Sequence, residues 1–493
     1  MWETILIGLL VVVFISWLKS SVRPSNFPPG PVNLPFVGSA MILDVRNLTK
    51  SFATLKNKYG DIFSIYVGST PVVVLNSYQV IKEAFDRHEF SGRPGNFSGT
   101  FFQKGRTGIS TTEGKHWKVQ RDFLENYLDN LTGAGHKAVE EVILDETTDL
   151  KSEFSKHEGE PVSVSYKTNI SILNVLWNVV CGRKLHSQQQ EFQTVYECID
   201  KITQFMSRAA IFSFLPVLTK LLPESITCIE RGRYYRNRFH EISEKWIQEH
   251  RQDYRGNRTG DLQDAYIQRI NQGDDTFSEQ GLAAMLREIF IIGAESESVM
   301  MRWVFRILSC NPQVQKKIQA ELEAVVGPKA QVKWENKDDL PYTMAAIKEI
   351  QRYADIAPTG LMHKTMCDVK IGGFTLPEGT LVMANISQCH RDPKLWLKPE
   401  QFYPEHFLTQ DNTLKSVEEL PGFLPYGIGK RACPGAKLAD MQIFLVVSNL
   451  LQEFSLSMPG EDAGVIATQF KSGTSVLRNP RPYRVVINNR VSS

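Results

Sequence analysis

Apolar residues recur at helical spacing along most of the chain, and only a few short runs have the composition of strands. These patterns predict helices over residues 139–154, 234–254, 278–310, 312–326, 342–353 and 436–451. Strands are expected at residues 62–67 and 71–75, which Gly68 and Ser69-Thr70 separate as a hairpin turn would. The sequence therefore predicts a mainly α fold with small β-sheets, of the α+β kind.

The amino end differs from the rest because residues 5–18 are almost wholly apolar. Glu3 precedes this run, and Lys19 and Arg23 follow it, which is the reverse of the charge order in a cleaved signal peptide. The positive-inside tendency then places the rest of the chain in the cytosol. We expect residues 1–23 to be a single-pass membrane anchor.

A proline-rich stretch, Phe27-Pro28-Pro29-Gly30-Pro31, follows the expected anchor. Proline fixes its own backbone angle and restrains the residue before it, so residues 24–35 are interpreted as a stiff hinge, with an ordinary loop as the alternative. No linker rich in Gly, Ser or Pro divides residues 36–493, which predicts one catalytic domain.

Charge and cysteine usage exclude several classes of function. The chain has 493 residues and a net charge of +2, without a long basic run, so nucleic acid is not an expected partner. Its seven cysteines form no CxxC pair, which argues against a zinc ribbon and against a disulfide framework. A reducing compartment fits this pattern best.

One cysteine has a setting suited to chemistry. Cys433 ends a glycine-rich stretch and directly precedes the helix predicted over 436–451. Amide dipoles at a helix start, together with Lys430 and Arg431, favour the thiolate, which is the form that binds a metal. The alternative is an inert buried cysteine in a loop that the glycines merely shape.

The stretch around Cys433 resembles the cysteine-ligand loop of the cytochrome P450 family, whose pattern is aromatic-x-x-Gly-x-Arg-x-Cys-x-Gly. The matching positions are Tyr426, Gly429, Arg431, Cys433 and Gly435. Tyr426 stands where Phe is usual, so it adds a hydroxyl on the cysteine side. The resemblance implies a cytochrome P450-type fold and Cys433 as the iron ligand of haem b (iron protoporphyrin IX), and it is nearest to animal microsomal members.

A second constellation is Glu349 and Arg352, three residues apart on one helix face. On its own such a pair is usually solvated and contributes little to stability. The resemblance implies that it is the buried Glu-x-x-Arg pair of the family, completed by His406, and that the three residues hold the cysteine loop in place.

The stretch Gly293-Ala294-Glu295-Ser296 resembles the family's acid-alcohol element over the distal face of the haem. Ile292 and Ser296 replace the usual Ala and Thr, and Glu297 stands where a second Thr or Ser is common. The resemblance implies Glu295 as a proton relay and Ser296 as a hydrogen-bonding alcohol. Without it, the stretch also fits a helix face turned to water.

Haem carries two carboxylates that require positive or hydrogen-bonding partners. The resemblance implies Trp117 and Arg121 from the Trp-x-x-x-Arg helix, together with Arg93, His363 and Arg431. Each of these residues alone is compatible with an ordinary structural role. The motifs occur in family order and cover the chain from Pro28 onward.

The resemblance implies a monooxygenase that inserts one atom of dioxygen into a small lipophilic substrate, by hydroxylation or epoxidation. No dinucleotide fingerprint is found in the chain, so electrons are expected from an NADPH-dependent cytochrome reductase, with a cytochrome b-type protein as a further donor. A haem-thiolate isomerase or dehydratase and a non-catalytic haem sensor remain alternatives. The expected location is the endoplasmic reticulum membrane, with membrane lipid as a partner.

Two further expectations concern surfaces. A basic docking surface for the electron donor is expected from Lys115, Lys118, Lys430, Arg431 and Lys437. Residues 101–104 and 205–214 are interpreted as walls of the substrate pocket.

Overall fold

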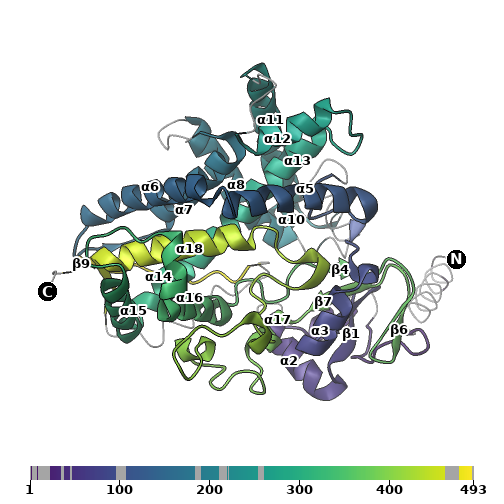
Figure 1. Cartoon of the computed structure of the whole chain (residues 1–493). Helices are drawn as coiled ribbons and strands as arrows, with labels where there is room; N and C mark the ends of the chain where they lie inside the picture. The colour runs from purple at the N-terminus through teal and green to yellow at the C-terminus, as the bar shows by residue number, and fades with distance from the viewer. Residues whose placement is uncertain are drawn as a thin grey trace.

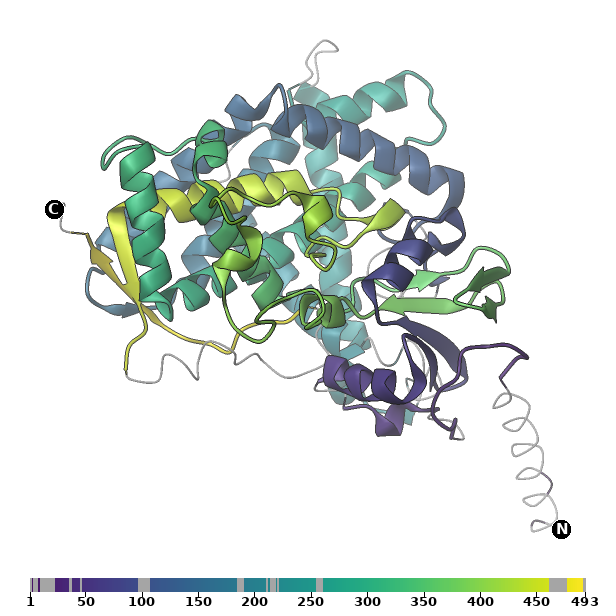
Figure 2. The same ribbon diagram turned by 60° about the horizontal axis from the view of Figure 1, so that its bottom comes forward.

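A computed structural model provides the structure of the chain. It describes residues 2, 8, 23–34, 38–44, 47–95, 107–183, 190–209, 212, 219, 221–253, 260–460 and 477–490. Most of the expected anchor, and residues 101–104 of the expected pocket wall, lie outside the described residues. Helices make up most of the molecule, and small sheets lie at its two ends (Figure 1, Figure 2). The prediction of a mainly α fold with small β-sheets is confirmed.

The helices occupy most of the predicted ranges. The described helices of eight or more residues are α2 (Leu48–Tyr59), α3 (Tyr78–Phe85), α5 (Gly114–Thr132), α6 (His136–Ser155), α7 (Ser165–Cys181), α8 (Gln190–Ala209), α11 (Ile229–Asp253), α12 (Leu262–Asn271), α13 (Glu279–Glu288), α14 (Ala294–Ser309), α15 (Pro312–Val325), α16 (Pro341–Ala354) and α18 (Ala436–Glu453). The shorter α10 (Glu224–Thr227) and α17 (Ile386–His390) join them. The helices predicted at 139–154, 234–254, 312–326, 342–353 and 436–451 are confirmed, with ends that differ by a few residues.

The helix predicted over 278–310 contains a feature that its pattern did not predict. It begins at α13, where the Ser278 hydroxyl accepts the Gly281 N–H at 3.1 Å, as an N-cap does. A π-helical turn, η4 (Ile289–Gly293), then interrupts the α-helical bonding before α14 continues to Ser309. Such turns add one residue to a helix and redirect the side chains beyond them. Glu295 and Ser296 follow this turn directly.

The larger sheet has the strand order β1 (Ile62–Val67), β2 (Thr70–Leu75), β7 (Leu381–Ala384) and β4 (His363–Lys364). The predicted hairpin is confirmed, because β1 and β2 pair antiparallel, with Thr70 in the strand instead of the turn. Strand β2 then pairs in parallel with β7, which lies about three hundred residues later in the chain. This pairing brings His363 beside the amino-terminal part of the chain.

Two smaller sheets complete the described strands. One has the order β3 (Pro161–Val162), β9 (Val485–Asn489) and β8 (Phe454–Ser457), and the other pairs β5 (Val369–Ile371) with β6 (Phe374–Leu376). Figures 1 and 2 show β9 at one end of the molecule and β1, β6 and β7 at the opposite end. The helices fill the space between the two ends.

The proline-rich stretch lies against strand β1. The Ser64 N–H donates to the Pro29 carbonyl at 2.7 Å, and the Ser64 hydroxyl donates to the Pro28 carbonyl at 2.8 Å. A Cβ on Gly30 would come within 1.8 Å of the Ser64 carbonyl oxygen, so the close approach requires glycine. Of the helices that the structure describes, none has both the length and the apolar character needed to cross a bilayer.

The largest apolar core surrounds α14 and α18. Helix α18 packs against α6, α15 and α5, and α14 packs against α7 and α16 (Figure 1). Phe290 of η4 contacts Trp177 of α7 and Trp246 of α11, with ring centroids 5.4 and 5.7 Å away. Because α18 is held on several sides, the residues just before its first turn have a fixed position. Cys433 is one of them.

Candidate functional site

The loop before α18 turns tightly around Cys433. The Cys433 N–H donates to the Tyr426 carbonyl at 2.9 Å, and the Ala432 N–H donates to the Gly429 carbonyl at 3.0 Å. Gly429 has φ +75°, and a Cβ there would lie 2.1 Å from the Phe85 carbonyl oxygen. The loop therefore requires glycine at this position, for its backbone angle and for its contact with α3.

The Cys433 side chain is exposed, yet it lies deep among protein atoms. Burial raises the pKa of the thiol, while a hydrogen bond from the Gly435 N–H and the charge of Arg121 lower it. Exposure and desolvation occur together when a group faces a hollow that protein surrounds. The thiol is therefore accessible although neighbouring protein atoms desolvate it, and a metal-binding cysteine must be accessible.

The cation that acts on Cys433 corrects one expectation. We expected Lys430 and Arg431 to favour the thiolate, but Arg121 of α5 is the cation that lowers the pKa of Cys433. Its guanidinium donates to the Ala432 carbonyl at 2.6 Å, next to the cysteine in sequence, and pairs with Glu125. Arg121 therefore binds the cysteine loop directly.

Arg431 points into the protein and not toward a docking surface. Its Nε donates to the Ser91 carbonyl at 2.8 Å, and its two terminal nitrogens donate to the carbonyls of Ile109 and Thr112 at 3.0 and 2.6 Å. The guanidinium carbon also lies 3.7 Å from the ring centroid of Trp117. The expectation that Arg431 contributes to a basic docking surface is wrong, because these contacts occupy the guanidinium.

Two of the expected docking lysines lie on the surface. Lys118 pairs with Asp122 one helical turn further along α5, and the Lys437 ammonium lies 2.6 Å from an Asp129 carboxylate oxygen. These lysines are exposed, as a docking role requires.

Two further expected cofactor-binding residues, Arg93 and His363, lie near Arg431. The Arg93 guanidinium donates to the Met362 carbonyl at 3.0 Å, which places it beside the next residue, His363. His363 Nδ1 is 2.8 Å from the Phe90 carbonyl, and the imidazole stacks on the Phe85 ring at 3.8 Å. Sheet pairing and loop contacts thus bring together residues from four distant parts of the chain.

The guanidinium groups of Arg93, Arg121 and Arg431 form a buried cationic group beside the imidazole of His363. Burial lowers the pKa values of Arg93, Arg431 and His363, and repulsion between neighbouring cations lowers them further: Arg121 acts on Arg93, Arg93 and Arg121 act on Arg431, and Arg93 and Arg431 act on His363. The acids Glu113 and Glu288 offset part of this cost. A bound anion would remove the repulsion, so the group suits a ligand with carboxylates.

Trp117 supplies an independent test of that fit. Its side chain is 2% exposed, and within the described part of the chain its indole Nε1 has no hydrogen-bond partner. A buried donor of this kind normally has a partner, because an unsatisfied donor costs about 1–3 kcal/mol. The arginine beside its ring and the free N–H fit the carboxylate of a flat, largely apolar cofactor.

Glu349 and Arg352 are fully buried on α16, so the alternative of a solvated pair does not apply. Two Arg352 nitrogens each donate to a Glu349 oxygen at 2.7 Å. His406 Nδ1 lies 3.2 Å from Glu349 Oε2. Arg352 also donates to the carbonyls of His390, Pro399 and Gln401. The three residues join α16 to the segment that leads to the cysteine loop.

The acid-alcohol stretch lies on the first turn of α14. Glu295 is half-buried and its carboxylate lies 3.2 Å from the Arg302 guanidinium. Burial raises the pKa of Glu295, which Arg302 partly opposes. The Ser296 hydroxyl donates to the Gly293 carbonyl at 3.2 Å, at the end of the π-helical turn. An acid with a raised pKa beside a hydroxyl can hold and pass a proton.

Sequence reasoning missed several residues of this region. Glu113 accepts the Arg93 N–H at 3.0 Å, and Glu288 accepts the Ile109 N–H at 2.7 Å, so both acids shape the segments that carry the cations. Asp440 and Gln351 were also missed, although both bind the Tyr426 hydroxyl. The available signal was Tyr426 itself, because a buried phenol requires partners.

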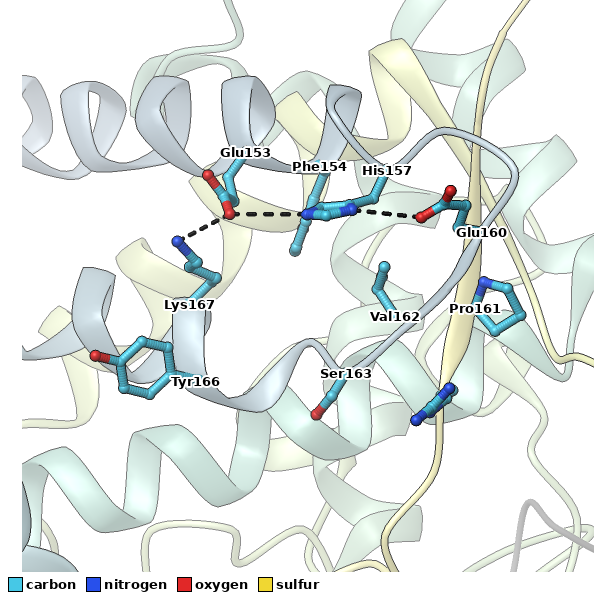
Figure 3. A pocket seen from close by; sticks show the side chains of 10 residues that line it. Glu153, Phe154, His157, Glu160, Pro161, Val162, Ser163, Tyr166 and Lys167 are labelled. Atoms are coloured by element: carbon cyan, nitrogen blue, oxygen red, sulfur yellow. Dashed lines mark ion pairs between the residues drawn. The ribbon is translucent and has the colours of Figure 1, made fainter.

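Two other places with charged side chains contain none of the expected site residues. A surface hollow of about 410 Å³ lies between α6 and α7, and in Figure 3 Lys167 and His157 both point toward Glu153. The Lys167 ammonium is 2.8 Å from a Glu153 oxygen, and His157 Nδ1 is 3.6 Å from Glu160. Lys167 and His157 of this hollow therefore have acidic partners within it.

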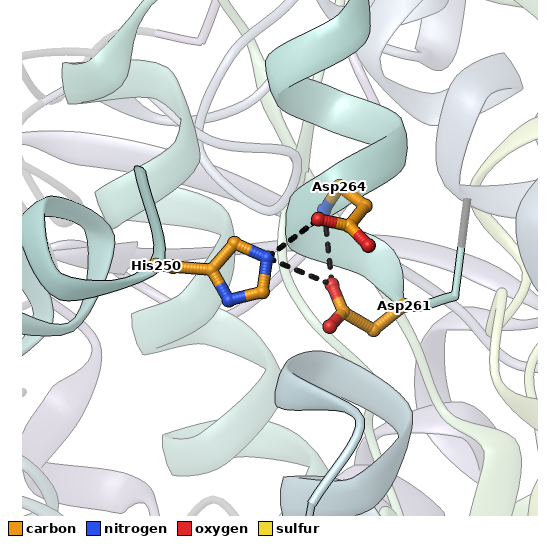
Figure 4. A group of neighbouring side chains, drawn as sticks. All are labelled: His250, Asp261 and Asp264. Atoms are coloured by element: carbon orange, nitrogen blue, oxygen red, sulfur yellow. Dashed lines mark hydrogen bonds and ion pairs between the residues drawn. The ribbon is translucent and has the colours of Figure 1, made fainter. Parts of the chain in front are cut away.

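The second place is His250, Asp261 and Asp264, whose potential metal-ligating atoms lie within 4.8 Å of one another (Figure 4). His250 Nε2 lies 2.7 Å from Asp264 Oδ1, and Asp261 Oδ1 accepts the Asp264 N–H at 2.9 Å as the N-cap of α12. These direct bonds give each side chain a structural role, which is to join α11 to the start of α12.

Comparison with known proteins identifies the family. The family model for Cytochrome P450 matches residues 28–487. Cytochrome P450 2J5 of Mus musculus is 30% identical over 502 residues, which cover 99% of this chain and 96% of the relative. Cytochrome P450 2L1 of Panulirus argus is 32% identical over 95% of this chain and 96% of the relative. Cytochrome P450 2J2 of Homo sapiens is 29% identical over 96% of this chain and 94% of the relative.

The chain belongs to the cytochrome P450 family. It is a haem-thiolate monooxygenase that binds iron protoporphyrin IX, and it inserts one atom of dioxygen into a small lipophilic substrate. Its electrons come from an NADPH-dependent reductase. The expectations of family, cofactor and reaction class are confirmed.

Proposed function

We propose that Cys433 is the thiolate ligand of the haem iron in this monooxygenase. The observation that carries the proposal is the Cys433 thiol, which is accessible although protein atoms desolvate it. It lies in a tight loop in which only glycine fits at position 429. Bound there, haem supplies the activation of dioxygen, which thiolate donation favours. The chain itself supplies the position, the charge and the protons.

The cationic group would bind the two haem carboxylates. Arg93, Arg121, His363 and Arg431 contribute the positive or hydrogen-bonding groups, and Trp117 contributes its free indole N–H. The carbonyl contacts of Arg431 and Arg121 hold the cations in place before any cofactor binds. Glu349, Arg352 and His406 would act at a distance by fixing the loop that carries Cys433.

On α14, Glu295 and Ser296 would hold and deliver protons. Glu295 holds a proton more readily than an exposed acid does, because burial raises its pKa. Ser296 lies one residue away, and its hydroxyl can turn from the Gly293 carbonyl to a bound water. Arg302 fixes the Glu295 carboxylate on α14, which keeps the acid near the hydroxyl.

The protein would work at the endoplasmic reticulum membrane, with residues 1–23 as a single-pass anchor, residues 24–35 as the connecting hinge and residues 36–493 as the cytosolic catalytic domain. The apolar run at residues 5–18 and the basic residues after it support this arrangement. Membrane lipid would then be a partner, and a cytochrome b-type protein would be a second electron donor. A chain without residues 2–22 should leave the membrane fraction in an alkaline carbonate wash and retain its haem; retention in the membrane would contradict a sole anchor at residues 1–23.

The carbon monoxide difference spectrum of the reduced protein tests Cys433 as the ligand. Thiolate ligation gives a Soret band that is strongly red-shifted from that of histidine ligation, and we expect Cys433→Ser to abolish this band. Cys367→Ser is the matched control, because Cys367 is also exposed but lies outside the site. A red-shifted band that survives in Cys433→Ser would exclude Cys433 as the ligand.

A further inference from the structure

A polar cluster lies behind the cysteine loop, and the proposed site does not use it. The Tyr426 hydroxyl donates to Asp440 Oδ1 at 2.6 Å. The Gln351 side-chain nitrogen donates to the same oxygen at 2.8 Å and lies 2.9 Å from the Tyr426 hydroxyl. We call Tyr426, Gln351 and Asp440 the Asp440 cluster. Its members come from the cysteine loop, α16 and α18.

The Asp440 cluster closes the cysteine loop around Cys433. The side chain of Tyr426 binds α18 through Asp440, and the carbonyl of Tyr426 accepts the Cys433 N–H at 2.9 Å. Gln351 is 2% exposed and directly precedes Arg352, which is part of the buried ion pair. The Asp440 carboxylate on α18 thus binds both Tyr426 of the cysteine loop and Gln351 of α16.

The cluster also places negative charge near the sulfur. The charges of Glu297 and Asp440 both raise the pKa of Cys433. Glu297 lies on α14 with 8% of its surface exposed, and in the described residues its Oε1 has no hydrogen-bond partner. Burial and the charge of Asp440 raise the pKa of Glu297 to about 8.

We propose that Asp440, held by Tyr426 and Gln351, is a positioning residue that adds negative charge behind the Cys433 sulfur and lowers the reduction potential of the bound haem iron. One electron from the reductase converts the ferric iron to the ferrous iron, and a fixed negative charge nearby opposes this gain of charge. Hydrogen bonds and charges around a ligand sulfur are known physical controls of such potentials. This inference rests on Cys433 being the iron ligand.

Asp440→Asn tests the inference, because asparagine keeps the shape and an acceptor oxygen for both donors but removes the charge. The purified holoprotein is reduced stepwise with dithionite in the presence of mediator dyes, and the haem spectrum gives the reduction potential. We expect a potential more positive than that of the wild type, together with an unchanged red-shifted Soret band of the carbon monoxide complex. Asp440→Glu restores the charge and should return the potential toward the wild-type value.

Asp129→Asn is the matched control for removal of a carboxylate. Asp129 is exposed at the end of α5 and pairs with Lys437 of α18, so water and salt screen its charge. The haem reduction potential of Asp129→Asn should equal that of the wild type. Asp440→Ala removes the same charge with a smaller side chain, and it is measured if the asparagine variant does not bind haem.

The outcomes separate this inference from the proposed function. A wild-type protein without the red-shifted band contradicts Cys433 ligation. If Asp440→Asn keeps the red-shifted Soret band and has the wild-type reduction potential, the proposed role of Asp440 is overturned. Ligation by Cys433 is not affected by that result. Failure of both neutral variants to bind haem also overturns it, because Asp440 would then be only a structural residue.

Discussion

The contacts of Arg431 and Trp117 illustrate how a cation is prepared for an anionic ligand. Three carbonyl oxygens bind the guanidinium of Arg431, and the indole of Trp117 lies against its face. Carbonyl oxygens are neutral, so they fix the direction of the guanidinium without cancelling its charge. A second cation, Arg93, raises the electrostatic cost of the arrangement. Glu113 and Glu288 offset part of that cost, and a bound anion would remove more of it.

Trp117→Phe should weaken haem binding, because it removes the free indole N–H and keeps an aromatic ring beside Arg431. A hydrogen bond to a charged group contributes about 1.5–3 kcal/mol, so we expect haem loss to be faster by a factor of roughly 10 to 100. The rate of haem transfer to excess apomyoglobin measures this change.

Trp177→Phe is the control for the tryptophan prediction. Trp177 also has a buried Nε1 without a hydrogen-bond partner in the described structure, but it packs against Trp246 and Phe290 in the apolar core. Its substitution should leave haem transfer at the wild-type rate. Equal acceleration in both variants would show that Trp117 acts through packing and not through its N–H.

Ser296 should control how efficiently electrons are used. Its hydroxyl has no methyl neighbour on Cβ, so its χ1 angle is freer than that of threonine. Ser296→Ala removes a hydrogen bond of about 1 kcal/mol, which corresponds to a roughly fivefold fall in product formed per NADPH oxidised. Ser296→Thr should raise this ratio above that of the wild type. Product and peroxide are both quantified, and a ratio that neither substitution changes would exclude Ser296 from proton delivery.

Helices were predictable from sequence where one face is apolar over several turns, as in α6, α15, α16 and α18. The π-helical turn at Ile289–Gly293 was not predictable, because it shifts the backbone hydrogen bonds by one residue within a stretch that is apolar at nearly every position. The sequence there gives no change of period that would mark the turn. Strand β7 was also missed, since a four-residue strand is specified by its partner β2 and not by its own pattern.

The contact of the cysteine loop with α3 gives a prediction about Gly429. Gly429→Ala places a Cβ at φ +75° and 2.1 Å from the Phe85 carbonyl oxygen, so either the loop or α3 must move. Haem content per chain should fall severely, and the thermal midpoint should drop.

Gly273→Ala provides the comparison for Gly429→Ala. Gly273 has φ +79°, but nothing lies within 4 Å of its added Cβ, so only the backbone strain of about 1–2 kcal/mol remains. Haem content should stay normal in this variant. If Gly429→Ala behaves like Gly273→Ala, the close approach to α3 is not required for haem binding.

The candidate site could be predicted from sequence only as a set of motifs. Resemblance to a family identified Cys433, the cations and the Glu349–Arg352 pair, but no local pattern gives the direction of a long side chain. Arg431 was therefore assigned to both a buried role and a docking surface, and its carbonyl contacts support only the first. Asp440 could not be found at all, since its partner Gln351 lies 89 residues away.

The molecule as a whole encloses the site by bringing distant segments together. Four segments meet between the sheet that contains β1 and β7 and the helices around α18. They are residues 85–93, 107–121, 363 and 429–433. This closure buries acids as well as cations. Glu297 is the clearest case, because desolvation is the main cause of its raised pKa and the charge of Asp440 raises it further. Glu297 in turn raises the pKa values of Tyr426 and Cys433. The free energy of unfolding should therefore change with pH across the range in which Glu297 ionises.

The pKa of Glu297 is about 8 in the folded protein, above the ordinary value near 4.5, so the folded state holds this proton more tightly than the unfolded state. The resulting stability is fully present below about pH 4.5 and is lost as pH rises through about 8. Glu297→Gln carries no titrating group, so its thermal midpoint should exceed that of the wild type increasingly between pH 5 and pH 9. At 1.36 kcal/mol per pKa unit the full difference is on the order of a few kcal/mol. The exposed Glu418→Gln should follow the wild type at every pH, and a constant gap for Glu297→Gln would mean that packing, not ionisation, sets its effect.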